Sequence, residues 1–184
     1  VIVDSDAACE ADDPFAIAHA LLCDKFIVKA VFAEHFNCEG STKQSFEEIQ
    51  RVVKAMKKEV PVLMGEIGKM SEKGTGEISE ASSFLIREAL REDDKPLYVL
   101  CIGAITNIAS AIQMCPDIVP RMTVVWIGGQ SHEHSTSEVR EFNAGNDIEA
   151  ANLVLGSGVR FWQIPNDVYG SMRISLAEIQ MRIA

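Results

Sequence analysis

The stretch VIVDSDAACEADDP, residues 1–14, decides the fold, because an apolar run passes directly into a segment with five acidic residues. An apolar run followed by Asp-x-Asp predicts a buried strand whose carboxylates emerge at its C-terminal end, where open α/β sheets bind their ligands. Carboxylates packed this closely either raise one another's pKa or are neutralised by a cation. A hard divalent metal ion with oxygen ligands would explain so many of them. We therefore predict the active site at this end of the sheet.

Strand-like and helix-like segments alternate along the rest of the chain, which favours βα units around a parallel sheet. After the first strand we expect strands at residues 26–32, 60–64, 96–102, 122–127 and 159–164, and helices at 14–22, 41–58, 79–91, 105–114 and 147–155. Asp13 is expected to cap the first helix, with Pro14 at its first position. The predicted fold class is α/β: a single domain over residues 1–184 with an open, mostly parallel, Rossmann-like sheet flanked by helices.

Composition limits the class of partner and the compartment. Asp and Glu number 27 against 17 Lys and Arg, and the net charge of -10 argues against nucleic acid or an anionic membrane as the main partner. The five cysteines show no Cys-x-x-Cys spacing, which favours reduced thiols in a cytoplasmic protein. No apolar stretch is long enough to span a membrane, and no secretion leader precedes the first strand. The chain begins without Met and ends within an amphipathic pattern at residues 175–184, so we expect its C-terminal part to be missing.

Candidate site segments follow four of the expected strands, at residues 4–13, 34–37, 103–107 and 128–146. Because the carboxyl ends of parallel strands meet at one edge of a sheet, one crevice could collect all four. Glu141 and Asn143 are separated by one residue, so in an extended stretch both side chains would point the same way. A carboxylate and an amide together can accept from and donate to the hydroxyl groups of a sugar.

Several other residues have a simpler structural explanation. Asp147 is expected to cap the helix that follows it. The His132-Glu133-His134 run resembles a pair of transition-metal ligands, but no third His or Cys has suitable spacing, so a solvated loop is the favoured interpretation. His35, next to Asn37 at a strand end, could reach the crevice, and reaching the crevice or lying away from it are about equally favoured. Trp126 and Phe142 are expected to be walls of the core or pocket rather than stacking platforms.

Taken together, the motifs resemble those of the nucleoside hydrolases, the inosine-uridine-preferring N-ribohydrolases. The resemblance is carried by Asp4-Ser5-Asp6 with Asp12-Asp13, Gly103-Ala104-Ile105-Thr106-Asn107, Val125-Trp126-Ile127-Gly128-Gly129, and Glu141-Phe142-Asn143 with Asp147. These motifs extend over nearly the whole chain in the family's order, and their combination is specific although each alone is not. The resemblance implies the nucleoside-hydrolase fold and calcium-dependent hydrolysis of the N-glycosidic bond of ribonucleosides, with release of base and ribose for salvage. We also expect a homo-oligomer, either a dimer or a tetramer.

The resemblance implies a metal site by position. It assigns a bound calcium ion to Asp6, Asp13 and the main-chain carbonyl of Ile102. Asp6 would also be the general base that takes a proton from a calcium-bound water. Asp4 would support these ligands without touching the ion. The chemistry is coherent, because a carboxylate-rich pocket stabilises the oxocarbenium-like transition state in which a ribosyl bond breaks.

The resemblance also assigns residues that hold the sugar. Asp12 and Asn37 would bind the 2′ and 3′ hydroxyls of the ribose. Glu141 and Asn143 would hold the sugar from the other side, including its 5′ hydroxyl. This chain carries two residues more before Asp12 than the commonest form of the family, so Glu10 is a candidate to share the role of Asp12.

Other departures from the family pattern leave alternatives open. Ser135 stands where many members have Asn, and the family's last calcium-binding Asp would lie beyond residue 184, since Asp167 matches a different position. The base preference is open as well. A magnesium-dependent phosphatase of the haloacid-dehalogenase type would use Asp4 as its nucleophile, but that family has Thr or Val soon after Asp-x-Asp, where this chain has Ala7-Ala8. A nucleoside or sugar binder without turnover is the non-enzymatic alternative.

Overall fold

In the computed structural model, which describes residues 1–72, 78–131 and 141–182, six parallel strands form one sheet. The strands are β1 (Ile2–Ser5), β2 (Ala30–Ala33), β3 (Val62–Met64), β4 (Leu97–Cys101), β5 (Met122–Ile127) and β6 (Arg160–Ile164). Their order is β3-β2-β1-β4-β5-β6, and every neighbouring pair is parallel. The chain order reverses between β1 and β4, which is the switch point where such sheets bind ligands. The predicted fold class is confirmed.

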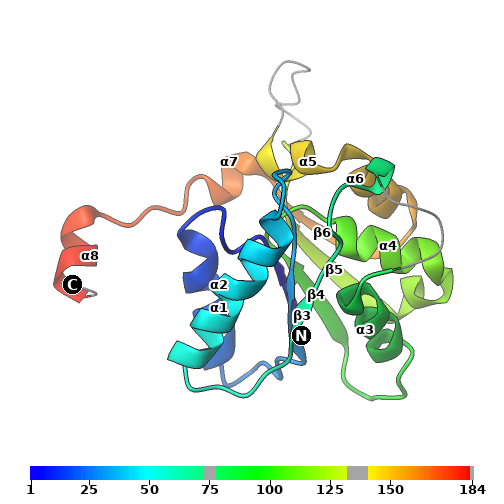
Figure 1. The fold of residues 1–184 in the computed structure, drawn as a ribbon, viewed down its shortest axis with the longest axis horizontal. Helices are drawn as coiled ribbons and strands as arrows, with labels where there is room; N and C mark the ends of the chain where they lie inside the picture. The colour runs from blue at the N-terminus through cyan, green and yellow to red at the C-terminus, as the bar shows by residue number, and fades with distance from the viewer. Residues whose placement is uncertain (73–77, 132–140, 183–184) are drawn as a thin grey trace.

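Helices cover both faces of this sheet (Figure 1). They are α1 (Asp12–Leu22), α2 (Ser41–Ala55), α3 (Glu80–Ala89), α4 (Thr106–Met114), α5 (Phe142–Asn146), α6 (Ile148–Gly156), α7 (Asn166–Tyr169) and α8 (Leu176–Arg182), with 3-10 turns η1 (Met70–Glu72) and η2 (Pro116–Arg121). The α1 and α2 helices pack on one face, and α3, α4 and α6 on the other. The α8 helix lies apart from the sheet, and none of its residues is buried. Among the described residues, no helix has the length and apolar character needed to cross a membrane.

Each face of the sheet buries its own apolar cluster. Ile2 belongs to the cluster beneath α3 and α4, whereas Val3 belongs to the cluster beneath α1 and α2, as the alternation of side chains along a strand requires. Every residue of β1 is buried, which is typical of a central parallel strand covered on both sides. The α2 helix presents Ser45, Ile49 and Val53, spaced four residues apart, as its buried face. The strand that carries the acidic motif is therefore held rigidly at the centre of the sheet.

Several of the predicted boundaries are wrong: α2 ends at Ala55 rather than at residue 58, β3 begins at Val62 rather than at residue 60, and the starts of α1 and β2 also differ. The α1 helix begins at Asp12, Ala11 occupies its N-cap without a side-chain hydrogen bond, and the carboxylate of Asp13 instead accepts a hydrogen bond from Ser5. The second strand is shorter than predicted, because residues 26–29 lie outside the sheet with exposed or partly exposed side chains. Apolar composition alone does not mark where the pairing of strands begins.

Candidate functional site

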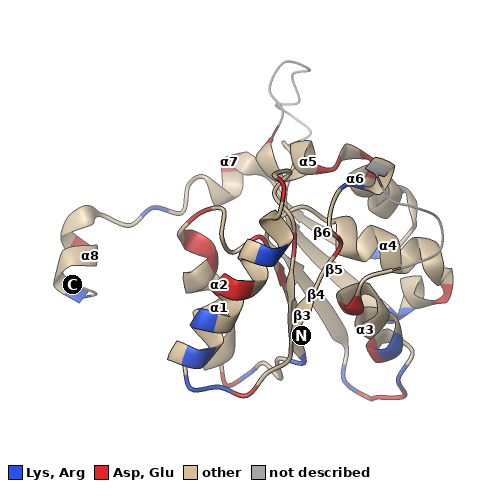
Figure 2. Ribbon diagram, in the orientation of Figure 1, with Lys and Arg blue, Asp and Glu red and all other residues tan. Residues whose placement is uncertain are grey.

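A cavity of about 360 Å³ opens at the carboxyl ends of β1, β4 and β5. Seven of the nine predicted site residues line it: Asp6, Glu10, Asp12, Asp13, Ile102, Glu141 and Asn143. Figure 2 shows acidic residues along the loop after β1 and the first turn of α1, which form one side of this cavity. The cavity therefore lies at the edge of the sheet that the first strand predicts.

The carboxylates of Asp6 and Asp13 are nearly buried, with 3% and 6% of each residue exposed. Burial, and then the neighbouring Asp13, raise the pKa of Asp6 to about 8. Burial also raises the pKa of Asp13 to about 7, assisted by the charges of Asp12 and Glu10 and opposed by a hydrogen bond of 2.6 Å from Ser5 Oγ. The protein itself thus disfavours the ionised form of both groups, and a divalent cation between them would reverse this preference.

The turn after β4 fits closely against Asp6. A Cβ atom at Gly103 would lie 2.6 Å from Asp6 Oδ1, so only glycine leaves room for this carboxylate. Trp126, a buried core residue as predicted, donates from Nε1 to the carbonyl oxygen of Gly103 at 3.0 Å and holds the turn in place. The neighbouring Ile102 lines the cavity, and its amide donates to the backbone oxygen of Asp4 at 2.9 Å. This turn therefore places Ile102 in the lining of the same cavity as Asp6 and Asp13.

The oxygen atoms of the cavity fit a hard divalent cation. Asp6 and Asp13 carry carboxylates and Ile102 has a main-chain carbonyl, which are the kinds of ligand that Ca²⁺ and Mg²⁺ prefer, and all three residues line the cavity. In the part of the chain that the structure describes, no group of three or more His, Cys, Asp or Glu side chains is arranged to hold a metal. A cation here would rely on the carbonyl and on water or ligand oxygens in addition to two carboxylates. Calcium, with roughly 6 to 8 oxygen ligands in flexible geometry, tolerates such a mixed set.

Glu141 lies at the N-cap of α5, and the predicted extended stretch around it is wrong. Its side chain accepts hydrogen bonds from the backbone amides of Asn143 at 3.0 Å and Ala144 at 2.9 Å. The amide of Gly129 at 2.6 Å and the hydroxyl of Tyr169 at 2.7 Å also donate to it. This carboxylate therefore has abundant partners within the protein, and it starts the helix that turns the chain at the cavity.

Asn143 lies within the first turn of α5 and is also nearly buried. Its side-chain nitrogen donates to the carbonyl oxygen of Ile127 at 2.9 Å and, more weakly, to that of Ile102 at 3.4 Å. The second contact joins a residue predicted to bind the sugar to the carbonyl predicted to bind the metal. The two predicted functions are thus adjacent in space.

Asp4 is fully buried and does not line the cavity. Its Oδ1 accepts a hydrogen bond from Asn107 Nδ2 at 2.8 Å, and Asn107 Oδ1 accepts another from the amide of Glu66 at 2.7 Å. Burial raises the pKa of Asp4 to about 7, and burial and then Asp4 raise the pKa of Glu34 well above its usual range. Asp4 therefore lies in a buried polar network behind the cavity, where it can support the site but not contact a ligand.

A second chain of buried hydrogen bonds explains His35 and Asp147. His35 Nε2 lies 2.8 Å from Thr106 Oγ1, and this hydroxyl donates to Asp147 Oδ2 at 2.8 Å. Asp147 Oδ1 accepts from the amide of Ala150 at 3.0 Å, which confirms the predicted helix cap. Because His35 is only 1% exposed, it occupies the core, the second of its two predicted places.

Some of the residues singled out in the sequence lie elsewhere. Asn37 is exposed, has a φ of 58°, donates from its amide to His35 Nδ1 at 3.2 Å, and does not line the cavity. Phe142 does line the cavity, as predicted for a pocket wall. The His132-Glu133-His134 run and Ser135 lie outside the described residues.

Sequence reasoning missed five residues that line the cavity: Cys9, Ala16, Ile127, Tyr169 and Met172. Tyr169 and Met172 follow β6. Because ligands bind at the carboxyl ends of parallel strands, the segment after β6 could have been predicted as part of the site from its position alone. Burial, and then the nearby acidic groups, raise the pKa of the Cys9 thiol to about 11, which keeps it protonated beside the carboxylates.

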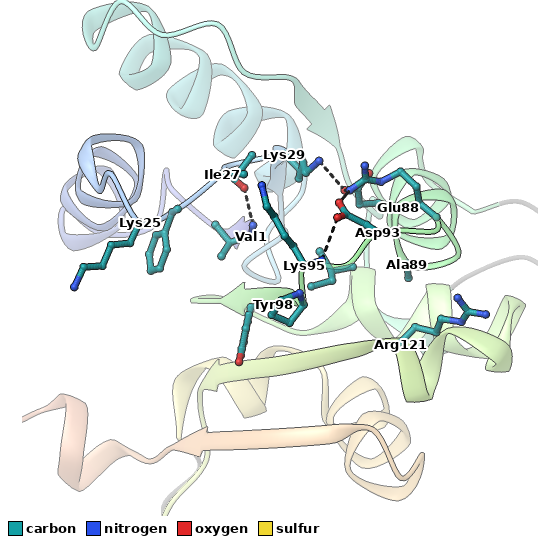
Figure 3. Close-up of a pocket in the computed structure, with 14 residues that line it drawn as sticks. Val1, Lys25, Ile27, Lys29, Glu88, Ala89, Asp93, Lys95, Tyr98 and Arg121 are labelled. Carbon is teal, nitrogen blue, oxygen red and sulfur yellow. Dashed lines mark hydrogen bonds and ion pairs between the residues drawn. The ribbon is translucent and has the colours of Figure 1, made fainter.

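A second cavity, of about 370 Å³, lies at the opposite end of the sheet (Figure 3). None of the nine predicted site residues lines it. Its Glu88 pairs with both Lys29 at 3.4 Å and Arg91 at 2.9 Å. Figure 3 shows Lys25 and Arg121 on opposite sides of this cavity. The strand-end cavity therefore remains the candidate site.

The family described as inosine-uridine preferring nucleoside hydrolase matches residues 1–183 of this chain. Non-specific ribonucleoside hydrolase RihC of Escherichia fergusonii is 35% identical over 91 residues, which cover 48% of this chain and 30% of that protein. RihC of Shigella sonnei is 36% identical over 84 residues, which cover 45% of this chain and 28% of that protein. The alignments with these curated relatives thus span less than a third of their length.

Solved structures share the fold. An Inosine-Guanosine Nucleoside Hydrolase superposes with a TM-score of 0.77 at 22% identity, covering 96% of this chain and 64% of that one. A Purine-Preferring Ribonucleoside Hydrolase from Gardnerella vaginalis superposes with a TM-score of 0.74 at 21% identity, covering 90% of this chain and 60% of that one. The chain therefore spans less than two thirds of the length of either structure, and at such identities the likeness concerns the fold alone.

Proposed function

Because the chain belongs to the inosine-uridine preferring nucleoside hydrolase family, we propose that it hydrolyses the N-glycosidic bond of ribonucleosides and releases a free base and ribose. The observation that carries the proposal is one cavity lined both by the buried carboxylates of Asp6 and Asp13 and by Glu141 and Asn143. The printed names of the curated relatives, ribonucleoside hydrolases, support the same reaction.

The proposed cofactor is calcium, in a family of metal-dependent hydrolases. Asp6, Asp13 and the main-chain carbonyl of Ile102 would hold it, since all three residues line the cavity. Bound there, calcium would lower the pKa of a coordinated water and orient it. Asp6 would take the proton from this water. A general base works best with a pKa near the working pH, and a cation would bring the pKa of Asp6 down from about 8.

The sugar would be held by residues on both sides of the cavity. Asp12 would bind the 2′ and 3′ hydroxyls, with Asn37 as its predicted partner. Since Asn37 lies outside the cavity lining, Glu10, which lines it, is the stronger candidate to share this role. Glu141 and Asn143 would hold the 5′ end of the ribose. The carboxylates around the ring would stabilise the positive charge that develops as the bond to the base breaks.

The phosphatase alternative fits this structure less well. It requires the carboxylate of Asp4 to attack a phosphoryl group. Asp4 is 0% exposed and is hydrogen-bonded to Asn107, so a substrate cannot reach it. A binder without turnover would have the same cavity, and only a measurement of reaction separates it from an enzyme.

A release assay tests the proposed reaction. Free base and ribose would be measured from inosine, uridine, adenosine and cytidine, with calcium and with a chelator. We expect release with calcium, loss on chelation, and recovery when calcium is restored. Asp6→Asn should lose activity, whereas Asp24→Asn, at an exposed position just after α1, should keep it. Calcium-dependent sugar binding without release would favour the binder, and neither binding nor release would sink the proposal.

Ribose specificity gives a second test of the metal's place in recognition. Vicinal hydroxyls can replace water on calcium, which accepts oxygen ligands in flexible geometry. A 2′-deoxynucleoside would lose one ligand to the metal and one hydrogen bond, together worth roughly 1 to 3 kcal/mol, or about tenfold to a hundredfold in rate. Equal rates of hydrolysis of uridine and 2′-deoxyuridine would show that the metal does not bind the 2′ hydroxyl of the sugar.

The proposal extends to setting and assembly. The proposed location is the cytoplasm, which is supported by the five cysteines, all of them free thiols as expected in a reducing compartment. The proposed role there is purine and pyrimidine salvage. The expected assembly is a homodimer or homotetramer. Light scattering of the purified protein would decide between these and a monomer.

A further inference from the structure

The carboxylate of Glu141 has no acceptor position left for a ligand. Its Oε1 accepts from the amide of Asn143 and the hydroxyl of Tyr169. Its Oε2 accepts from the amides of Gly129 and Ala144. An ionised carboxylate has about four acceptor positions, and these four donors fill them. A ligand hydroxyl can therefore bind Glu141 only by replacing one of the four.

Only one of these donors is free to leave. Three are main-chain amides, fixed by the turn after β5 and the first turn of α5. The fourth is the side-chain hydroxyl of Tyr169, which comes from α7, a helix of four residues, and lines the cavity. Asn166 Nδ2 donates to the Tyr169 oxygen at 2.9 Å, which leaves the hydroxyl hydrogen for Glu141. Burial raises the pKa of Tyr169 to about 12, so this hydroxyl keeps its proton.

We propose that the Tyr169 hydroxyl stands in for a ligand hydroxyl on Glu141 and is displaced when the ligand binds. The inference rests on the proposed function, in which Glu141 holds the 5′ hydroxyl of the ribose, and it identifies Tyr169 as a specificity-determining residue. A ligand must supply a hydrogen-bond donor in place of the Tyr169 hydroxyl that it displaces, because leaving a buried carboxylate oxygen without its hydrogen bond costs free energy. A free 5′ hydroxyl meets this condition. A 5′-phosphate is an anion without a strong donor, so nucleotides should be rejected.

The test is a cycle of four affinities, measured by calorimetry in the presence of calcium. Wild type and Tyr169→Phe would each be titrated with methyl β-D-ribofuranoside and with its 5-deoxy analogue, which differ in one hydroxyl. In wild type the 5-hydroxyl should add little affinity, since it exchanges one hydrogen bond for another. In Tyr169→Phe it should add about twofold to tenfold more, the range of one net hydrogen bond. An equal or smaller contribution in the variant would overturn the proposal, because Tyr169 would then be a bystander or a direct ligand contact.

A spectroscopic measurement follows the displacement without relying on affinity or turnover. The chain has two tyrosines, Tyr98 and Tyr169, so fluorotyrosine labelling gives two ¹⁹F signals, and Tyr169→Phe identifies one of them. The furanoside should shift the Tyr169 signal, and the 5-deoxy analogue should shift it much less. Equal shifts would contradict displacement. Tyr98 lines the opposite cavity, so Tyr98→Phe is the matched control and should leave the affinity cycle unchanged.

The failure of this inference can be told apart from the failure of the proposed function. If wild type binds the furanoside with calcium and releases base from nucleosides, but the cycle shows no coupling, only the role of Tyr169 is refuted. If wild type neither binds the sugar nor releases base, the proposed function is refuted and the role of Tyr169 with it.

Discussion

The two sides of the cavity treat their carboxylates in opposite ways. Asp13, on the β1 side, receives one side-chain hydrogen bond, from Ser5, and burial raises the pKa of both Asp13 and Asp6. Glu141, on the α5 side, receives four hydrogen bonds from other residues. In the proposed function a cation from outside completes the β1 side, whereas the Glu141 carboxylate already has four partners within the protein. On that proposal, ligand binding would add partners on the β1 side and exchange one on the α5 side.

Removal of either carboxylate on the β1 side should have the largest effect. Asp6→Ala and Asp13→Ala should each abolish calcium binding, and loss of the general base should lower base release about 10²- to 10⁴-fold. Both variants should stay folded, because each substitution relieves the burial of a charge beside other acids. Calorimetric titration with calcium, with circular dichroism as the check on folding, would measure this. Undiminished calcium affinity in either variant would contradict the metal assignment.

On the α5 side the same kind of substitution should spare the metal. Glu141→Ala and Asn143→Ala should bind calcium like wild type while kcat/KM falls by about tenfold to a hundredfold, because each removes a hydroxyl contact that is expected to strengthen in the transition state. Glu141→Ala should also destabilise the protein by about 1 kcal/mol, since it removes the cap of α5. Release assays and thermal unfolding separate the two effects. Unchanged turnover in the double variant would rule out the sugar-binding role.

The same contrast explains what the sequence could predict. The acids of the β1 side lie within residues 4–13, so composition and one strand signal were enough to locate them. Glu141 was also identified, but its local structure was not. The helix that it starts depends on donors from Gly129 and Tyr169, which are 12 and 28 residues away. Such partners become visible only once the sheet brings its strand ends together.

The supporting network behind the cavity was beyond sequence reasoning for the same reason. Asn107 and Asp4 are 103 residues apart, yet a hydrogen bond of 2.8 Å joins them and links the first turn of α4 to β1. His35 looked equally suited to reach the crevice or to lie away from it until its contact with Thr106, 71 residues away, placed it in the core. Local patterns predict strands and their polar ends, but tertiary contacts decide which polar side chains face a ligand.

A smaller steric change should disturb the β1 side alone. In Gly103→Ala the new Cβ would meet Asp6 Oδ1 at 2.6 Å, so the carboxylate must move. We expect calcium affinity to fall about tenfold, corresponding to the lower end of the roughly 1 to 3 kcal/mol that such overpacking costs. Gly156→Ala is the matched control, because nothing lies within 4 Å of a Cβ atom there. Equal calcium affinities in the two variants would show that Asp6 need not hold its present position.

Without calcium, the β1 side should also make the stability of the protein depend on pH. The folded pKa values of Asp6 and Asp13, about 8 and 7, lie above the ordinary value of 3.8 expected in the unfolded chain. Between about pH 4 and pH 8 the folded state therefore binds more protons than the unfolded state, so the free energy of unfolding falls as pH rises. With chelator present, the melting temperature should be lower at pH 8.5 than at pH 5.5.

Calcium and one substitution should both reduce this slope. Calcium favours the ionised carboxylates of the folded state, so it should raise the melting temperature most at high pH. Asp6→Asn should make the melting temperature fall less steeply with pH, although Asp4 and Glu34, which also have raised pKa values, contribute in the same direction and keep part of the slope. Asp24→Asn should leave the slope as in wild type. Two outcomes would contradict this prediction: a melting temperature that rises with pH under chelation, or equal slopes in Asp6→Asn and Asp24→Asn. Either would mean that the pKa of Asp6 is not raised in the folded protein, so the two sides of the cavity would not differ in this way.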